Sequence, residues 1–280
     1  MQGDSPKART AGAREVSTNQ TDIYDKLEEV VRKYALSSYL RPIADHTRTA
    51  FAEAARFVEK FYSDAGTATQ VSTCDVAYKV ILDSGCGTGE STVNIALDHP
   101  DMPVIGIDKS VARLAKTGGA ALNGAGSLPP NAFLVRAELL DFWRLALDEV
   151  TAGRWSIPYH ALYYPNPWPK QSEATRRFHL HPIFPTLLQL GDTIELRTNW
   201  EIYAREFAEA VRVAKSAAKI LPIRGPCALS NKLLSAVRPH CAGMTTDRIA
   251  FTPKQPITAF ERKYKEARQQ LWRVVISNKT

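Results

Sequence analysis

An apolar run that turns on three glycines constrains the fold of this chain most, and it reads VILDSGCGTGE over residues 80–90. Asp83 precedes glycines at alternate positions, Gly85, Gly87 and Gly89, and helical sequence follows them. Alternate glycines let a backbone turn sharply and approach a ligand where a Cβ would clash. A carboxylate before such a turn offers an acceptor where open α/β sheets bind ligands. The stretch therefore predicts a strand, a ligand-binding loop and a helix, and an ordinary glycine-rich turn is the alternative.

The segments that follow this loop alternate between strand and helix patterns. Strands are predicted at residues 80–83, 104–108, 132–136, 159–164, 193–197 and 271–277. Helices are predicted at residues 24–39, 48–61, 90–97, 110–117, 139–150, 184–190 and 203–218. Such alternation predicts one mostly parallel α/β sheet with helices on both faces, and the first two helices form an N-terminal extension.

Composition and charge narrow the classes of partner. The net charge of +7 permits a polyanionic partner such as nucleic acid but does not require one. The four cysteines lack C-x-x-C spacing, so we expect free thiols in a reducing, cytoplasmic compartment and no metal. We expect no membrane span. Residues 1–20 contain no apolar core and are expected to form a disordered tail, with residues 21–280 as a single domain.

Two further carboxylates follow the next two predicted strands. Asp108 ends the second strand, roughly 20 residues after Gly89, where a carboxylate accepts hydrogen bonds from ribose hydroxyls. Glu138 follows the third strand at the same edge of the sheet, where it would accept from an adenine amino group. The alternative for each is a place at the N-terminus of the next helix. Together with the glycine loop, these residues indicate a nucleoside cofactor.

The fourth predicted strand runs into the proline-rich segment Tyr163–Lys170, which reads YYPNPWPK. Three alternate prolines leave its backbone few conformations, which suits a loop that fixes a substrate atom beside a cofactor. A rigid surface turn is the alternative. Arg176 and Arg177 fit phosphate contacts or a solvated basic face. His179 and His181 share one face of an extended segment, but no cysteine or carboxylate nearby completes a metal site.

Four motifs in the same order resemble those of bacterial-type tRNA guanine-N7 methyltransferases. The glycine loop resembles motif I of class I S-adenosylmethionine-dependent methyltransferases. Pro165–Lys170 resembles the (F/Y)PDPWPK motif of the tRNA enzymes, and Leu196–Glu201 with Tyr203 resembles their TDWEPY segment. Pro256–Arg262 resembles their TKFE stretch. The dinucleotide fingerprint G-x-G-x-x-G fits less well, because its third glycine would fall on Glu90.

The resemblance implies a Rossmann-like, mostly parallel seven-stranded sheet and methyl transfer from S-adenosylmethionine to N7 of a guanine in tRNA. Guanine N7 carries no proton, so positioning and electrostatics rather than a general base would supply the rate. The residues expected around the cofactor are Asp83, Gly85, Gly87, Gly89, Asp108, Glu138 and Asn166, the last also in the catalytic position. Those expected to contact RNA are Lys170, Arg176, Asn199, Thr258 and Glu261, with Glu261 accepting from the guanine ring and amino N–H groups.

Three departures from the family pattern leave two other functions open. Asn166 and Asn199 stand where the family usually has Asp, and Glu173 stands where His is common. Two amides in place of carboxylates remove favourable charge beside the cationic product. Asn166-Pro-Trp also resembles the (D/N)PP(Y/W) motif of amino-methyltransferases, in which an Asn oxygen and a proline carbonyl accept from an exocyclic amine. The other alternative is a noncatalytic RNA-binding relative that keeps the fold.

Overall fold

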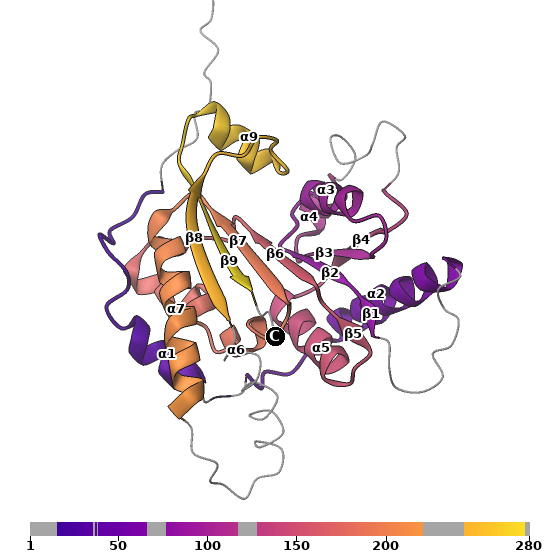
Figure 1. The fold of residues 1–280 in the computed structure, drawn as a ribbon, viewed down its shortest axis with the longest axis horizontal. Coiled ribbons are helices and arrows are strands. Elements are labelled where there is room, and N and C mark those ends of the chain that lie inside the picture. Colours follow the sequence, from indigo (N-terminus) through magenta and orange to yellow (C-terminus); the bar gives the residue numbers. More distant parts are fainter. Residues whose placement is uncertain are drawn as a thin grey trace, which may run out of the picture.

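A mixed sheet forms the centre of the molecule (Figure 1). The computed structural model describes residues 16–35, 37, 39–65, 77–116, 128–220 and 244–277. Within them the sheet has seven strands in the order β4-β3-β2-β6-β7-β9-β8. Its strands are β2 (Ile81–Ser84), β3 (Val104–Asp108), β4 (Ala132–Arg136), β6 (Tyr159–Tyr163), β7 (Thr193–Thr198), β8 (Thr245–Phe251) and β9 (Leu271–Ser277). The strands β4, β3, β2, β6 and β7 are parallel, and β9 runs antiparallel to both β7 and β8. The prediction of a mostly parallel, seven-stranded α/β sheet is confirmed.

Helices cover both faces of this sheet because its central strands are apolar on both sides. On β2, Ile81 packs with Ile95 of one face, whereas Leu82 belongs to the larger core on the other. Helix α3 covers the first face and α2, α5 and α7 cover the second (Figure 1). The helices are α1 (Leu27–Ala35), α2 (Asp45–Asp64), α3 (Glu90–Asp98), α4 (Val111–Leu114), α5 (Leu139–Thr151), α6 (Phe184–Leu187), α7 (Glu201–Ile220) and α9 (Ala259–Glu266).

The smaller elements complete the framework around the sheet. Two short 3-10 helices, η1 (Gln171–Arg176) and η2 (Phe178–Leu180), follow the proline-rich segment. A separate two-stranded parallel sheet pairs β1 (Tyr78–Lys79) with β5 (Trp155–Ser156). None of the helices in the described ranges is long and apolar enough to cross a membrane.

Strand β8 and helix α9 were not predicted, and both are polar elements at the edge of the fold. Most side chains of β8 are exposed because the strand lies at the end of the sheet. Helix α9 buries only Glu261 among its eight residues. Neither element therefore carries the apolar periodicity on which sequence prediction rests.

The expected disordered tail over residues 1–20 is wrong for its last part. Residues 1–15 lie outside the described residues, but Val16 packs against the larger core. The hydroxyl of Thr18 donates to the carbonyl of Pro169 at 2.6 Å, and Gln20 is only 6% exposed. The polar composition of this segment predicts solvated residues, whereas Thr18 and Gln20 instead bind polar groups of segments that are distant in the sequence. Among the cysteines, Cys86 is buried and free, and Cys74, Cys227 and Cys241 lie outside the described residues.

Candidate functional site

The carboxyl ends of β2, β3 and β6 surround a cavity of about 430 Å³. Four of the predicted cofactor residues line it, Gly85, Asp108, Glu138 and Asn166. They come from four separate loops, which the parallel strands bring to one edge of the sheet. Apolar side chains supply much of the remaining wall, namely Ile107, Leu139, Leu140, Leu162 and Phe178. The cavity thus combines an apolar body with a few convergent polar groups, as small-molecule sites do.

The glycine loop and Asp108 hold each other in place. The amide of Gly87 donates to one carboxylate oxygen of Asp108 at 3.0 Å, and the amide of Ser110 donates to the other at 2.8 Å. Arg113 also pairs with the first of these oxygens at 3.4 Å, whereas the oxygen bonded to Ser110 keeps a second lone pair that can accept from a ligand. Gly85 has a φ of +79°, and no protein atom lies within 4 Å of the position that a Cβ would take. A ligand can therefore approach this backbone closely.

Asp83 supports the loop from beneath and does not line the cavity. Its carboxylate is 1% exposed and accepts from the hydroxyls of Ser91 and Thr92, both at 2.6 Å. Burial raises the pKa of Asp83 to about 6, although these two hydrogen bonds lower it. The bonds tie the end of β2 to the first turn of α3. The expectation that Asp83 faces the cofactor is therefore replaced by a role in fixing the loop.

Gly89 is also outside the cavity lining, as is Gly87. Gly89 is the N-cap of α3, with a φ of +79°, and the side chain of Leu134 lies 2.6 Å from where its Cβ would be. Packing against β4 rather than ligand contact therefore requires a glycine there. Glu138 is exposed at the N-cap position of α5, but its side chain makes no capping hydrogen bond. The residue lines the cavity instead of capping the helix.

The proline-rich loop presents Asn166 in a strained turn. Tyr164 and Trp168, on either side of it, have φ angles of 50° and 44°, which side chains other than glycine rarely adopt. The amide of Trp168 donates to Oδ1 of Asn166 at 3.2 Å. The carbonyl of Pro167 accepts from Nε of Arg177 at 3.2 Å. Both acceptors of the Asn-Pro pair are thus engaged within the protein.

The two arginines after this loop have different environments. The guanidinium of Arg176 lies 4.6 Å from the ring centroid of Trp168, beside the cavity, and pairs with Glu173 at 3.2 Å. Lys170 is exposed immediately before η1. Arg177, by contrast, is 0% exposed and ion-paired with Glu206, so the expectation that it contacts phosphate is wrong.

The histidines do not form a metal pair. His179 is buried and bonded to Glu206 at 2.9 Å, whereas His181 lines the cavity. Across the described ranges, no three His, Cys, Asp or Glu side chains gather as metal ligands would.

The C-terminal motif, Pro256–Arg262, contacts the proline-rich loop through the bond between Glu261 and Tyr164. Thr258 is the N-cap of α9, and its hydroxyl accepts from the amide of Glu261 at 3.0 Å. The Glu261 carboxylate is 0% exposed and accepts from Arg197 at 2.7 Å, from the Tyr164 hydroxyl at 3.1 Å and from the Ile257 amide at 2.9 Å. In this arrangement Glu261 cannot accept from a guanine edge, because its carboxylate is fully buried and does not line the cavity. It supports Tyr164, which lines the cavity.

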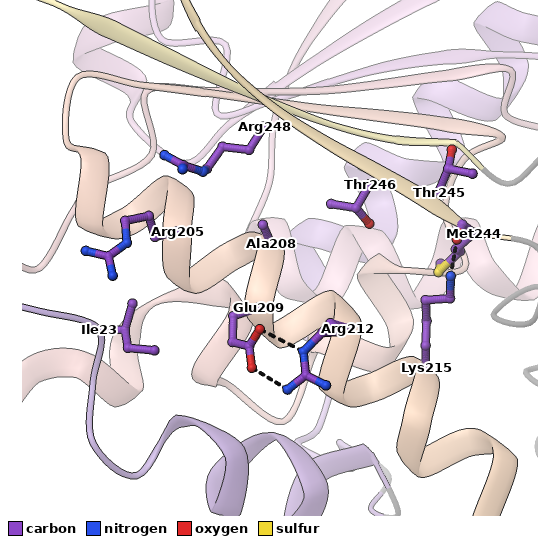
Figure 2. Close-up of a pocket in the computed structure, with 10 residues that line it drawn as sticks. All are labelled: Ile23, Arg205, Ala208, Glu209, Arg212, Lys215, Met244, Thr245, Thr246 and Arg248. Atoms are coloured by element: carbon purple, nitrogen blue, oxygen red, sulfur yellow. Dashed lines mark hydrogen bonds and ion pairs between the residues drawn. The ribbon is translucent and has the colours of Figure 1, made fainter.

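Asn199 is half-buried, directly follows β7 and lies two residues before α7, and it does not line the cavity. A second, more open hollow of about 570 Å³ lies between α7 and β8 (Figure 2). It contains none of the predicted site residues, and its four cationic side chains are Arg205, Arg212, Lys215 and Arg248.

Comparison with known families decides what kind of protein carries this cavity. A family model described as "Putative methyltransferase" matches residues 77–222, which contain the glycine loop, both further carboxylates and the proline-rich loop. The chain belongs to this methyltransferase family. The match covers about half of the sequence and all four loops that line the cavity.

Curated relatives of the methyltransferase carry one common name. The tRNA (guanine-N(7)-)-methyltransferase of Actinobacillus pleuropneumoniae is 33% identical over 137 residues, 48% of this chain and 51% of that protein. The enzyme of the same name from Acinetobacter baylyi is 31% identical over 134 residues, 45% of this chain and 49% of that protein. The enzyme of that name from Stutzerimonas stutzeri is 26% identical over 197 residues, which are 68% of this chain and 69% of that protein. The chain spans about half the length of the first two relatives.

Among solved structures, the methyltransferase is similar to the 16S rRNA methyltransferase KamB. The sequence identity is 14%, the TM-score is 0.44, and the match covers 87% of this chain and 98% of that one.

A buried chain of hydrogen bonds beneath the cavity was missed from the sequence. In this methyltransferase, Trp143 donates to the Ser84 hydroxyl at 2.8 Å, and that hydroxyl lies 2.8 Å from Nε2 of His160. The other ring nitrogen of His160 lies 2.8 Å from the carbonyl of Leu190 and must donate to it. Burial lowers the pKa of His160 to about 4, so the imidazole is neutral and its Nε2 accepts from the Ser84 hydroxyl. The available signal was a single His within an apolar strand.

Proposed function

We propose that this methyltransferase transfers a methyl group from S-adenosylmethionine to N7 of a guanine in tRNA. The observation that carries the proposal is the single cavity in which Gly85, Asp108, Glu138 and Asn166 meet. The shared name of the curated relatives supports the choice of acceptor.

The cavity residues fit the proposed cofactor. The free lone pair on Asp108 would accept from a ribose hydroxyl, and Glu138 would accept from the adenine amino group. The open face of Gly85 leaves room for the cofactor beside the loop. The volume of about 430 Å³ lies within the range of small-molecule sites. Bound S-adenosylmethionine would supply an electrophilic methyl group on its sulfonium.

The hydrogen bonds of Asn166 favour a guanine Hoogsteen edge over an exocyclic amine. An amino-methyltransferase loop needs the Asn oxygen and the following proline carbonyl as acceptors for the amine. Here each oxygen already accepts one hydrogen bond, the first from the Trp168 amide and the second from Arg177, which leaves fewer acceptor sites for an amine. The NH₂ of Asn166 is a donor with no hydrogen bond to any of the described residues. Guanine presents only acceptors at this edge, N7 and O6, so a donor to O6 would orient N7 for attack.

Exposed cations beside the cavity support an RNA substrate. Lys170 ends the loop that carries Asn166, and Arg176 ends the following helix η1 and stacks on Trp168 of the loop. Such groups would hold phosphates on either side of a base that enters the cavity. We further propose that the described elements form one domain with α1 and α2 as its N-terminal extension, and that tRNA places the protein in the cytoplasm.

The direct test is incubation of the purified protein with bulk tRNA and methyl-labelled S-adenosylmethionine, followed by digestion to nucleosides. We expect the label in 7-methylguanosine. Label in a nucleoside methylated on its exocyclic amine would overturn the proposal in favour of an amino-methyltransferase. Binding of cofactor and tRNA without any label would identify a noncatalytic relative.

A further inference from the structure

A buried polar cluster lies directly beneath the proline-rich loop. Arg177, Glu206 and His179 are at most 1% exposed, and Gln20 is 6% exposed. The NH1 group of Arg177 donates to both oxygens of Glu206, at 2.8 and 2.6 Å. Gln20 donates to Glu206 at 2.6 Å and accepts from NH2 of Arg177 at 2.9 Å. The cluster joins the N-terminal segment, the turn before η2 and helix α7.

The remaining donors of Arg177 all reach the loop that carries Asn166. Its NH2 group donates to the carbonyl of Trp168 at 2.8 Å. Its Nε–H is shared between the carbonyls of Pro167 and Trp168, at 3.2 and 3.3 Å. These two residues close the turn around Asn166, and Trp168 has the strained φ of 44°. Such backbone strain persists only where surrounding bonds over-determine it.

The cluster is more than a means of filling the core. A buried ion pair is costly unless every donor is satisfied, and apolar residues of similar volume often stabilise as well. Arg177 satisfies all five of its N–H groups, and two of its partners are loop carbonyls that an apolar residue would leave unbonded. Trp200 lies 4.9 Å from its guanidinium and limits its movement.

The N-terminal segment fastens the same loop at its other end. The Thr18 hydroxyl donates to the carbonyl of Pro169, and the Gln171 amide donates to Asn19 at 3.1 Å. Glu206 also accepts from the amide of Tyr24 at 2.7 Å. Residues 18–24 therefore reach both the proline-rich loop and the acid that orients Arg177.

From these contacts we infer that Arg177, oriented by Glu206 and by Gln20 of the N-terminal segment, is a positioning residue that holds Asn166 in its strained turn at the cavity. The inference rests on the proposed function, because the turn matters to catalysis only if Asn166 faces the methyl acceptor. It assigns residues 18–24 a part in building the site, although they lie far from the glycine loop in the sequence.

The test compares Arg177→Lys with a matched control, Arg212→Lys. Arg212 also pairs with a carboxylate of α7 through two bonds, to Glu209 at 2.8 and 2.5 Å, but it is exposed in the hollow between α7 and β8 (Figure 2). Lysine keeps the charge at both positions and loses the planar donor fork. Only the first substitution should therefore release the loop.

The first readout is hydrogen exchange of the protein without cofactor or RNA. Between Pro165 and Pro169 only Asn166 and Trp168 carry amide hydrogens. We expect the Trp168 amide to exchange at least about 10-fold faster in R177K than in the wild type and to be unchanged in R212K. Equal exchange in the two variants would overturn the inference.

The second readout separates positioning from general damage. We expect R177K to lower kcat about 10-fold or more while the KM for S-adenosylmethionine changes less than about 3-fold, because the Asp108 side of the cavity is untouched. If R177K fails to fold, Gln20→Ala provides the test, because it removes a bond between a neutral side chain and Arg177. We then expect Trp168 amide exchange to be about 3-fold or more faster and kcat to be about 3-fold or more lower than in the wild type. A folded Q20A with wild-type exchange and kcat would contradict the inference. A wild type that transfers no methyl would refute the proposed function instead, and exchange would still decide on the loop.

Discussion

At the scale of single residues, the site depends on which atoms of each polar side chain remain free. Asn166 commits its oxygen to the backbone of Trp168 and keeps its NH₂ available at the cavity. Asp108 accepts a backbone amide on each oxygen, and the oxygen that does not also pair with Arg113 retains a lone pair. A donor on Asn166 and an acceptor on Asp108 in one cavity match an acceptor-rich base edge and a ribose.

Asn166→Ala removes both the donor and the bond that closes the turn. We expect the rate of methyl transfer to fall on the order of 100-fold, comparable with the loss of one preorganised donor at a reacting centre. Asn166→Asp keeps an acceptor for the Trp168 amide and should retain more activity than the alanine variant. Single-turnover rates with saturating S-adenosylmethionine measure both. Equal rates in the wild type and N166A would remove Asn166 from the reaction.

Asp108→Asn tests the carboxylate that is proposed to accept from the cofactor ribose. The substitution preserves shape and removes the charge, so the charge-assisted hydrogen bond to ribose becomes weaker. We expect the Kd for S-adenosylmethionine to rise about 10- to 100-fold in isothermal titration calorimetry, which corresponds to about 1.4 to 2.8 kcal/mol. Asp101→Asn, an exposed carboxylate in the turn that precedes β3, is the matched control. An unchanged Kd for D108N would contradict the proposed cofactor site.

At the scale of elements, the bonds that position the loops are buried and join segments far apart in the sequence. The chain from Trp143 through Ser84 to His160 and Leu190 connects α5, β2, β6 and the end of the segment after α6. This series of hydrogen bonds requires a neutral imidazole at His160. Burial lowers the pKa of His160 to about 4, although the bond to Leu190 raises it.

This neutral histidine makes stability depend on pH. The unfolded chain binds a proton near pH 6.5 and the folded protein near pH 4, so His160 contributes stability above this range that is lost as pH falls through it. The slope is up to about 1.4 kcal/mol per pH unit. Asp83 acts in the opposite sense, since its raised pKa lets the folded state bind a proton first.

The difference between wild type and His160→Gln isolates the histidine from Asp83. Urea unfolding at several pH values should show the advantage of the wild type shrinking as the pH falls from about 6.5 to 4. A constant difference would mean that His160 does not titrate in this way.

Sequence patterns located the cavity lining because those residues follow apolar strands. Asp108 ends a predicted strand, Glu138 and Asn166 each lie two residues beyond one, and parallel strands bring such positions together. The patterns gave no means of distinguishing Arg176 from Arg177, although one is exposed and the other fully buried. That difference depends on Glu206 and Gln20, which tertiary contacts alone bring near. The burial of Asp83 and Glu261 was missed for the same reason, because their partners are hydroxyls, amides and an arginine of other elements.

At the scale of the whole molecule, part of the excess positive charge lies near the cavity, as exposed cations at the end of the loop that carries Asn166 and in η1. Lys170 and Arg176 would contact phosphates of the RNA, and the affinity that such contacts supply falls strongly as the salt concentration rises. We expect tRNA affinity to fall linearly with salt on a double-logarithmic plot. Lys170→Gln should reduce the slope by about one, and Lys60→Gln, an exposed cation on α2, should leave it unchanged. Equal slopes for the wild type and both variants would exclude Lys170 from the RNA contact.

Transfer to N7 itself is tested most directly by removing that atom from the substrate. Two transcripts of one tRNA, one made with guanosine and one with 7-deazaguanosine, differ only in N7 being replaced by C–H. With labelled S-adenosylmethionine, we predict label in the guanosine transcript and none in the 7-deazaguanosine transcript. Equal label in the two transcripts would contradict methylation at N7.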